Sequence, residues 1–193
     1  MRFYHLMRVT FVSLLMATPV ALGQRRKQLS VGDPAPGLDV AEWVKGEFDP
    51  AEAEVYVVEF WATWCGPCKK SIPHLTELQE TYGQDGLSII GITSEDLEIV
   101  EPFVRKQGSN MEYAVGIDHR GATERVWMKA AGKNGIPTAF VVDRGGSIQF
   151  IGHPLSEEFE SVLAKVMTGR YDQAKEEKAR PLIEAARRNL STT

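Results

Sequence analysis

Cysteine is scarce in this sequence, which has only Cys65 and Cys68 among its 193 residues. One disulfide between cysteines so close together would constrain almost nothing, which excludes a protein held together by disulfides. A zinc site is also disfavoured, because two more ligands would have to come from His74, His119 and His153, and none of these is paired at a ligand spacing. The two cysteines are therefore expected to serve chemistry.

The chain has no excess of basic residues, no low-complexity tract and no internal repeat of the kind that builds solenoids. It has 22 basic and 26 acidic residues, a formal net charge of −4. The negative sign and the absence of a basic stripe interleaved with aromatic residues argue against nucleic-acid binding. The length fits one domain with a sizeable core, and we place this domain at residues 24–170.

The one long apolar run lies at the N-terminus. Arg2, His5 and Arg8 make the start of the chain basic, Val9–Leu22 is mostly apolar, and a small residue, Gly23, precedes Gln24. This order is typical of a secretory signal peptide spanning residues 1–23. As a helix the apolar run would span only about 21 Å, against roughly 30 Å of membrane hydrocarbon. The basic residues Arg25–Lys27 can hinder export, so an uncleaved N-terminal membrane anchor is the alternative.

Strand patterns alternate with helix patterns along the chain, which predicts an α/β domain. The expected strands are Leu38–Trp43, Val55–Phe60, Leu87–Thr93, Tyr113–Ile117, Thr138–Val142 and Ser147–Gly152, of which the last two form a hairpin. The expected helices are Pro67–Tyr82, Leu97–Gln107, Ala122–Ala131 and a helix capped by Ser156 and ending at Met167. Glu95 and Asp96 suit the first turn of the second helix. The charged segment 171–193 is expected to form a helical tail, packed on the domain or binding a partner.

The cysteines stand between a buried strand and a helix, in the segment Trp61–Lys70, whose sequence is WATWCGPCKK. A thiol at the start of a helix is acidified by free backbone N–H groups and the helix dipole, so Cys65 is expected to be partly thiolate near neutral pH. Cys68, one helical turn later, can close a disulfide with it. Pro67 has no N–H to offer that thiolate, which favours a reducing couple. This pattern indicates dithiol–disulfide exchange.

The segment WCGPCK between a strand and a helix, with Pro73 five residues after the second cysteine and an Ile136-Pro137-Thr138 turn further on, resembles thioredoxin. The entry segment Val31–Pro36 and the strand–helix insertion Leu97–Ala131 are similar to the TlpA/ResA branch of that superfamily. The resemblance covers about residues 29–169. It implies a thioredoxin-like fold, with a central mixed β-sheet flanked by helices and an N-terminal extension.

The resemblance also implies roles for particular residues. Cys65 matches an exposed attacking cysteine, and Cys68 matches a buried resolving cysteine. Pro137 matches a cis-proline beside the disulfide, which leaves backbone groups free to pair with an extended substrate segment. We expect substrate contacts from the residues around the pair and around that proline. They are Trp64, Gly66, Pro67, Ile136 and Pro137.

Glu59 is an acid inside an otherwise apolar strand. From its pattern alone it could lie on a partly exposed edge. The resemblance places it instead beneath the active site, as a buried acid that carries a proton for the resolving thiol, with a raised pKa. Thioredoxin has the shorter aspartate here, and Leu87–Thr93 contains no lysine to match the partner of that aspartate.

The resemblance implies a thiol-disulfide oxidoreductase outside the cytoplasm, in the bacterial periplasm, with the Cys65–Cys68 pair as redox centre and no cofactor or metal. Its expected partners are disulfide-bearing exported proteins, such as cytochrome c precursors or copper-site proteins, and a membrane-bound electron donor. Three alternatives are a thiol oxidase or isomerase on the same fold, a peroxidase, and a non-enzymatic assembly module. A peroxidase would carry threonine at the position of Ala62.

Overall fold

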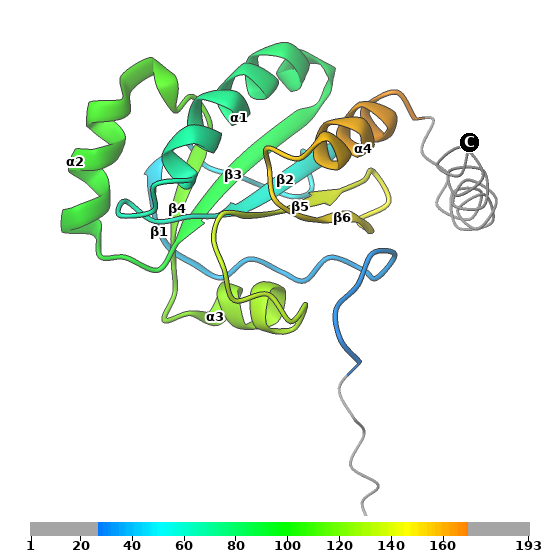
Figure 1. Ribbon diagram of the computed structural model, residues 1–193, viewed down its shortest axis with the longest axis horizontal. Coiled ribbons are helices and arrows are strands. Elements are labelled where there is room, and N and C mark those ends of the chain that lie inside the picture. The colour runs from blue at the N-terminus through cyan, green and yellow to red at the C-terminus, as the bar shows by residue number, and fades with distance from the viewer. Residues whose placement is uncertain (1–26, 170–193) are drawn as a thin grey trace, which may run out of the picture.

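A computed structural model describes residues 27–169 (Figure 1). The predicted signal peptide at residues 1–23 and the predicted helical tail at residues 171–193 lie outside the described residues. No helix between residues 27 and 169 combines the length and the apolar character needed to cross a membrane.

Six strands form one mixed sheet in the order β1-β4-β3-β2-β5-β6. The strands are β1 (Val40–Lys45), β2 (Val55–Phe60), β3 (Leu87–Thr93), β4 (Ala114–Asp118), β5 (Thr138–Val142) and β6 (Ile148–Gly152). Strands β2, β3 and β4 run parallel to one another, whereas β1 is antiparallel to β4 and β5 is antiparallel to both β2 and β6. Every residue of β2 is buried, as its run of β-branched and aromatic side chains predicts for a central strand.

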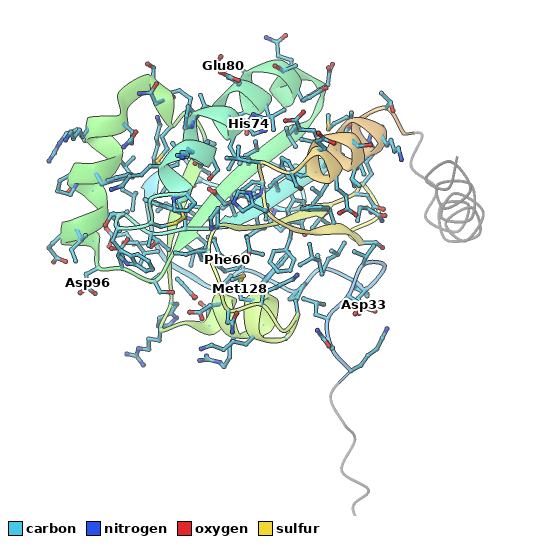
Figure 2. The ribbon with its side chains drawn as sticks, in the orientation of Figure 1. Asp33, Phe60, His74, Glu80, Asp96 and Met128 are labelled. Carbon is cyan, nitrogen blue, oxygen red and sulfur yellow. A yellow bond between two sulfur atoms is a disulfide. The ribbon has the colours of Figure 1, made fainter. Side chains whose placement is uncertain are left out.

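Helices cover both faces of the sheet (Figure 1). The helices are α1 (Cys68–Tyr82), α2 (Leu97–Gln107), α3 (Ala122–Glu124), the π-helical turn η3 (Arg125–Lys129), α4 (Glu157–Met167) and two 3-10 turns, η1 (Gly83–Asp85) and η2 (Gly108–Asn110). One core cluster joins Val55 and Val57 of β2 to α1, α2 and α4. The other joins Val58 and Phe60 to η3. In Figure 2, Phe60 and Met128 lie together on this second side.

The predicted elements agree with the structure, with small shifts at their ends. β2, β3, α2 and β5 have the predicted bounds, and Ser156 caps α4 by accepting a hydrogen bond from Phe159 N at 3.2 Å. The predicted helix Ala122–Ala131 is partly wrong, because regular α-helix ends at Glu124 and a wider turn follows. Two successive side chains of this wider turn, Trp127 and Met128, are buried against the sheet.

The N-terminal extension packs along the hairpin of β5 and β6. Gly32 N donates to Ile148 O at 2.7 Å, and Ile148 N donates to Asp33 O at 3.0 Å. Leu29 N donates to Ala130 O, next to η3, at 2.9 Å. Leu29 and Ala35 also pack against the second core cluster. The extension is therefore part of the folded domain.

Candidate active site

The two cysteines lie where β2 ends and α1 begins. The chain leaves the sheet after Phe60, and Pro67 already has helical angles (φ −62°, ψ −35°), so α1 starts at Cys68. Cys65 and Cys68 form a disulfide, with their Cα atoms 5.2 Å apart. Cys68 N points at Cys65 Sγ from 3.1 Å, as expected for a sulfur beside a helix N-terminus.

The prediction that Cys65 is exposed is wrong for the disulfide form. Its side chain is 3% exposed, against 0% for Cys68. The reason is that Cys65 Sγ turns inward to bond Cys68 and lies 3.8 Å from the carbonyl oxygen of Ile136. The exposed surface here belongs to its neighbours Trp64, which is 71% exposed, and Gly66 and Pro67. A partner would therefore meet these residues around the pair.

The cis-proline prediction is confirmed, because the Ile136–Pro137 peptide bond is cis. It lies directly before β5, the antiparallel neighbour of β2. Cys65 Sγ contacts the carbonyl oxygen of Ile136, which is 71 residues further along the chain. The fold therefore brings the cis-proline turn next to the loop that contains the cysteines. That Trp64, Gly66, Pro67, Ile136 and Pro137 contact a substrate stays a prediction.

Glu59 lies in the interior of the sheet and not at an edge. Its strand β2 runs between β3 and β5, and the residues paired with Glu59 are the small Gly91 and Ala139, which leave room for a longer side chain. The carboxyl is fully buried on the α1 side, where Ser71 Oγ lies 2.6 Å from Glu59 Oε1, within hydrogen-bonding distance. Burial raises the pKa of Glu59 from 4.5 to about 8, although the nearby hydroxyls of Ser71 and Tyr113 act in the opposite direction.

Tyr113 is a residue of this site that sequence reasoning missed. It stands just before β4, is 5% exposed, and lies so near Glu59 that burial and the carboxylate raise the pKa of its hydroxyl well above the ordinary value. In thioredoxin the partner of the acid is a lysine, which would lie in Leu87–Thr93 here, whereas the Tyr113 hydroxyl comes from the segment just before β4. Ser71 was missed for a different reason, since one serine in a helix carries no signal of its own.

Glu95 has a different role from the predicted one. It was expected in the first turn of α2, but its carboxylate accepts hydrogen bonds from Thr63 N at 2.5 Å and Thr63 Oγ1 at 2.8 Å. Thr63 lies in the loop before the cysteines, so Glu95 holds that loop to the end of β3. Asp96 is the N-terminal cap position of α2, without a capping bond from its side chain.

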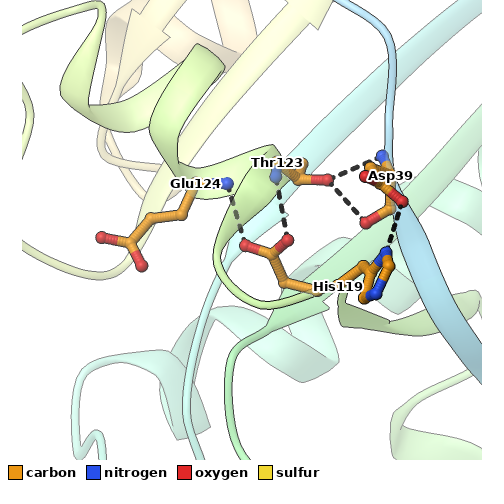
Figure 3. A network of polar contacts seen from close by, with 5 residues as sticks. Asp39, His119, Thr123 and Glu124 are labelled. Carbon is orange, nitrogen blue, oxygen red and sulfur yellow. Dashed lines mark hydrogen bonds and ion pairs between the residues drawn. The ribbon is translucent and has the colours of Figure 1, made fainter.

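The remaining tryptophans and histidines pack or lie at the surface. Trp61 is buried and stacks on Phe103 of α2, with ring centroids 5.4 Å apart, and Trp127 is fully buried. The imidazole of His119 is 48% exposed and lies 3.1 Å from Asp39 in the polar network of Figure 3. Within residues 27–169, no three histidine, cysteine or acidic side chains come together as a metal-ligand group.

Comparison with known proteins gives concordant matches. Residues 31–151 match the AhpC/TSA family. The chain is 34% identical to protein FixW of Rhizobium leguminosarum, over 74% of this chain and 68% of that one. It is 31% identical to the thiol-disulfide oxidoreductase ResA of Bacillus anthracis, over 73% of this chain and 81% of that one.

The fold is likewise similar to solved structures. A crystal structure of a thiol:disulfide interchange protein, a thioredoxin family protein from Chlorobium tepidum, matches with a TM-score of 0.60 and 29% identity. The match covers 72% of this chain and 98% of that chain. The predicted thioredoxin-like fold is therefore confirmed, including the mixed sheet with helices on both faces.

Proposed function

Because the chain belongs to the AhpC/TSA family and is a thiol-disulfide oxidoreductase with Cys65 and Cys68 as its redox pair, we propose that it works outside the cytoplasm as a reductant of disulfides in exported proteins. The observation that carries the proposal is the placement of the pair. The two sulfurs lie at the N-terminus of α1, beside the cis-proline turn, under a rim of exposed residues.

The exchange proceeds in two steps. In the first, the Cys65 thiolate attacks one sulfur of the partner's disulfide, a mixed disulfide forms, and the partner's other sulfur leaves as a thiolate. In the second, the Cys68 thiolate attacks Cys65 Sγ, the mixed disulfide breaks, and the partner's second sulfur leaves. The partner gains two electrons, and the pair ends as the disulfide seen in the structure.

Glu59 serves the second step as the base for Cys68. A thiol inside the core is a poor nucleophile until its proton leaves. Glu59 has a pKa of about 8, so its carboxyl can gain and lose a proton near neutral pH. Ser71 Oγ lies within hydrogen-bonding distance of both this carboxyl and the backbone oxygen of Cys68, which connects the acid to the resolving cysteine through one side chain.

The reducing direction is supported by the dipeptide between the cysteines. Among the described backbone groups, Cys68 N is the donor that reaches Cys65 Sγ, while Pro67, one residue earlier, has no N–H. Fewer donors leave the Cys65 thiolate less stabilised, so the reduced pair gives up its electrons more readily. Thioredoxin, a reductant, has a potential of about −270 mV, against about −120 mV for a strong oxidant such as DsbA.

The proposed partners follow from this chemistry. The protein would reduce disulfides in exported proteins, such as cytochrome c precursors awaiting haem or copper-site proteins awaiting metal. A membrane-bound electron donor would reduce the Cys65–Cys68 disulfide again. The apolar segment Val9–Leu22 would export the chain to the periplasm, either as a cleaved signal or as a retained anchor.

The reduction potential of the pair tests this proposal. The protein is equilibrated in thiol buffers of known potential, and the reduced fraction is read by alkylation of Cys65. A value below about −220 mV is expected for a reductant. A value above about −160 mV would contradict the proposal and indicate disulfide formation or isomerisation. The absence of any reversible transition would favour a binding module.

A further inference from the structure

Two buried hydroxyl groups meet at Glu59, and the exchange described above does not assign either of them a role. Ser71 comes from α1 and is fully buried, and Tyr113 comes from the segment before β4. Ser71 Oγ lies 2.6 Å from Glu59 Oε1 and 3.0 Å from the backbone oxygen of Cys68. Glu59, Ser71 and Cys68 therefore form a short chain of polar contacts from the acid to the resolving cysteine.

The number of protons decides how this chain is hydrogen-bonded. A serine hydroxyl has one proton, and both the Cys68 carbonyl and an ionised Glu59 could only accept it. Both contacts of Ser71 are hydrogen bonds at once only if Glu59 is protonated and donates to Ser71 Oγ, while Ser71 donates to Cys68 O. The disulfide form thus fits a neutral Glu59. When Glu59 ionises, Ser71 turns its proton to the carboxylate.

Tyr113 stands at the other oxygen of the carboxyl. Neither Glu59 Oε2 nor the Tyr113 hydroxyl completes a hydrogen bond with any described residue, although both are buried. Burial and the nearby Glu59 carboxyl raise the pKa of Tyr113, so the phenol keeps its proton and is available as a donor. An unpaired buried acceptor beside an unpaired buried donor is unfavourable, and ionisation of Glu59 would strengthen their attraction.

Gly91 makes room for this arrangement. It pairs with Glu59 across the β2–β3 ladder, and a Cβ atom there would lie 3.2 Å from Tyr113 Cε2 and 2.9 Å from Trp61 Nε1. The other residue paired with Glu59, Ala139 of β5, brings no titratable group. The hydroxyls of Ser71 and Tyr113 are therefore the groups that act on the pKa of this carboxyl, and the buried Trp61 Nε1, which has no hydrogen-bond partner among the described residues, lies beside Gly91.

We propose that Ser71 and Tyr113 are positioning residues for the exchange, whose hydroxyls hold the Glu59 carboxyl and stabilise its ionised form until it takes the proton of Cys68. The inference rests on the proposed role of Glu59 as base. In the step, the Cys68 S–H proton moves to Glu59, the Cys68 thiolate bonds Cys65 Sγ, and the partner's sulfur leaves as a thiolate. The proton then lies on Glu59, as the contacts of Ser71 in the disulfide form require.

The direct test is the pKa of Glu59 in the oxidised protein. This pKa is followed by NMR, as the carbon-13 chemical shift of the Glu59 side-chain carboxyl against pH. The signal is assigned by its loss in Glu59→Gln. It is then titrated in the wild type, in Ser71→Ala and in Tyr113→Phe. Because hydrogen bonds to a carboxylate are roughly twice as strong as those to a neutral acid, each variant should raise the pKa of Glu59 by about 0.5 to 1. Ser71→Thr, which keeps the hydroxyl, should have the wild-type pKa of Glu59.

Thr123→Val is the matched control. It also removes a fully buried hydroxyl, but that hydroxyl bonds Asp39, on the side of the sheet opposite α1. It should leave the pKa of Glu59 unchanged. If Ser71→Ala and Tyr113→Phe behave like this control, the inference is overturned.

The kinetic test uses a mixed disulfide between Cys65 and a small aromatic thiol, whose release reports the attack by Cys68. In Ser71→Ala and Tyr113→Phe the rate of thiol release should reach its midpoint at a higher pH, in step with the raised pKa of Glu59. Release of the thiol at pH 7 should then be about three- to tenfold slower. A uniform loss of rate with an unmoved midpoint would overturn the inference. If Glu59→Gln released the thiol at the wild-type rate, the role of Glu59 as base would be overturned. Unchanged pKa values of Glu59 in Ser71→Ala and Tyr113→Phe would instead overturn only the positioning role of the two hydroxyls.

Discussion

At the scale of single residues, the burial of Glu59 changes the affinity of its carboxyl for a proton. In the unfolded chain its carboxyl ionises with a pKa near 4.5, while in the folded protein burial raises this to about 8. Between these values the folded state binds a proton that the unfolded state has released. The contribution of Glu59 to stability therefore falls as pH rises through this range.

We predict that this fall is removed in Glu59→Gln. For the oxidised wild type, the contribution of Glu59 is fully present below about pH 4.5 and is lost as pH rises to about 8. The two pKa values correspond to a loss of roughly 5 kcal/mol, an upper figure because the buried site can relax. Urea unfolding of both proteins from pH 4.5 to pH 8.5 measures the difference.

The direction in which the difference in unfolding free energy between the two proteins changes with pH decides whether the prediction holds. The variant should gain on the wild type as pH rises, because glutamine has no proton to lose. A constant difference between the two unfolding curves across this range would mean that Glu59 has an ordinary pKa in the folded protein. That result would also remove the basis for its role as a base near neutral pH.

At the scale of elements, the start of α3 depends on one buried carboxylate. Asp118, the last residue of β4, accepts hydrogen bonds from Thr123 N at 2.8 Å and Glu124 N at 2.9 Å, and these two contacts are drawn in Figure 3. Thr123 Oγ1 in turn accepts from Asp39 N and donates to Asp39 O. The network joins β4, α3 and the segment before β1, on the side of the sheet opposite α1.

We predict that Asp118→Asn destabilises the protein by about 1–3 kcal/mol. Asparagine keeps one acceptor oxygen, so its NH₂ group would face a backbone N–H that then has no partner. Thermal unfolding measures the loss. Asp39→Asn is the control, since that side chain is 58% exposed and its contact with His119 should contribute little. Equal losses in the two variants would contradict the capping role of Asp118.

At the scale of the whole molecule, the N-terminal extension completes the second core. Its backbone bonds to the β5–β6 hairpin, with Ala35 N donating to Gly146 O at 2.8 Å. Leu29, Ala35 and Leu38 pack against the core cluster around Phe60. Removing this segment would expose apolar surface that the sheet alone cannot cover.

We predict that a chain starting at Gly37 is less stable than one starting at Lys27, by several kcal/mol. The estimate follows from about 25 cal/mol for each Å² of apolar surface exposed, applied to two apolar side chains and the surface beneath them. The chain starting at Lys27 keeps the contacts described here and is the matched control. Equal urea midpoints for the two chains would show that the extension contributes nothing to the fold.

Much of this architecture could be predicted from local pattern. β2, β3 and α2 have the predicted bounds because runs of β-branched residues and helical periodicity mark them directly. The site residues Cys65, Cys68 and Pro137 follow from a short motif and one turn. Tyr113 did not follow, because its contact with Glu59 depends on which strand lies beside β3, and no local pattern contains that information.

The sequence by itself determined the α/β class, the redox pair at a helix start and the presence of an acid in the central strand. These depend on neighbours within one or two turns of the chain. Only the tertiary structure decided that Cys65 is covered in the disulfide form, that Glu95 holds Thr63, and that Ser71 and Tyr113 face Glu59. The physical reason is that exposure, hydrogen-bond partners and a raised pKa depend on which distant segments exclude water from a group.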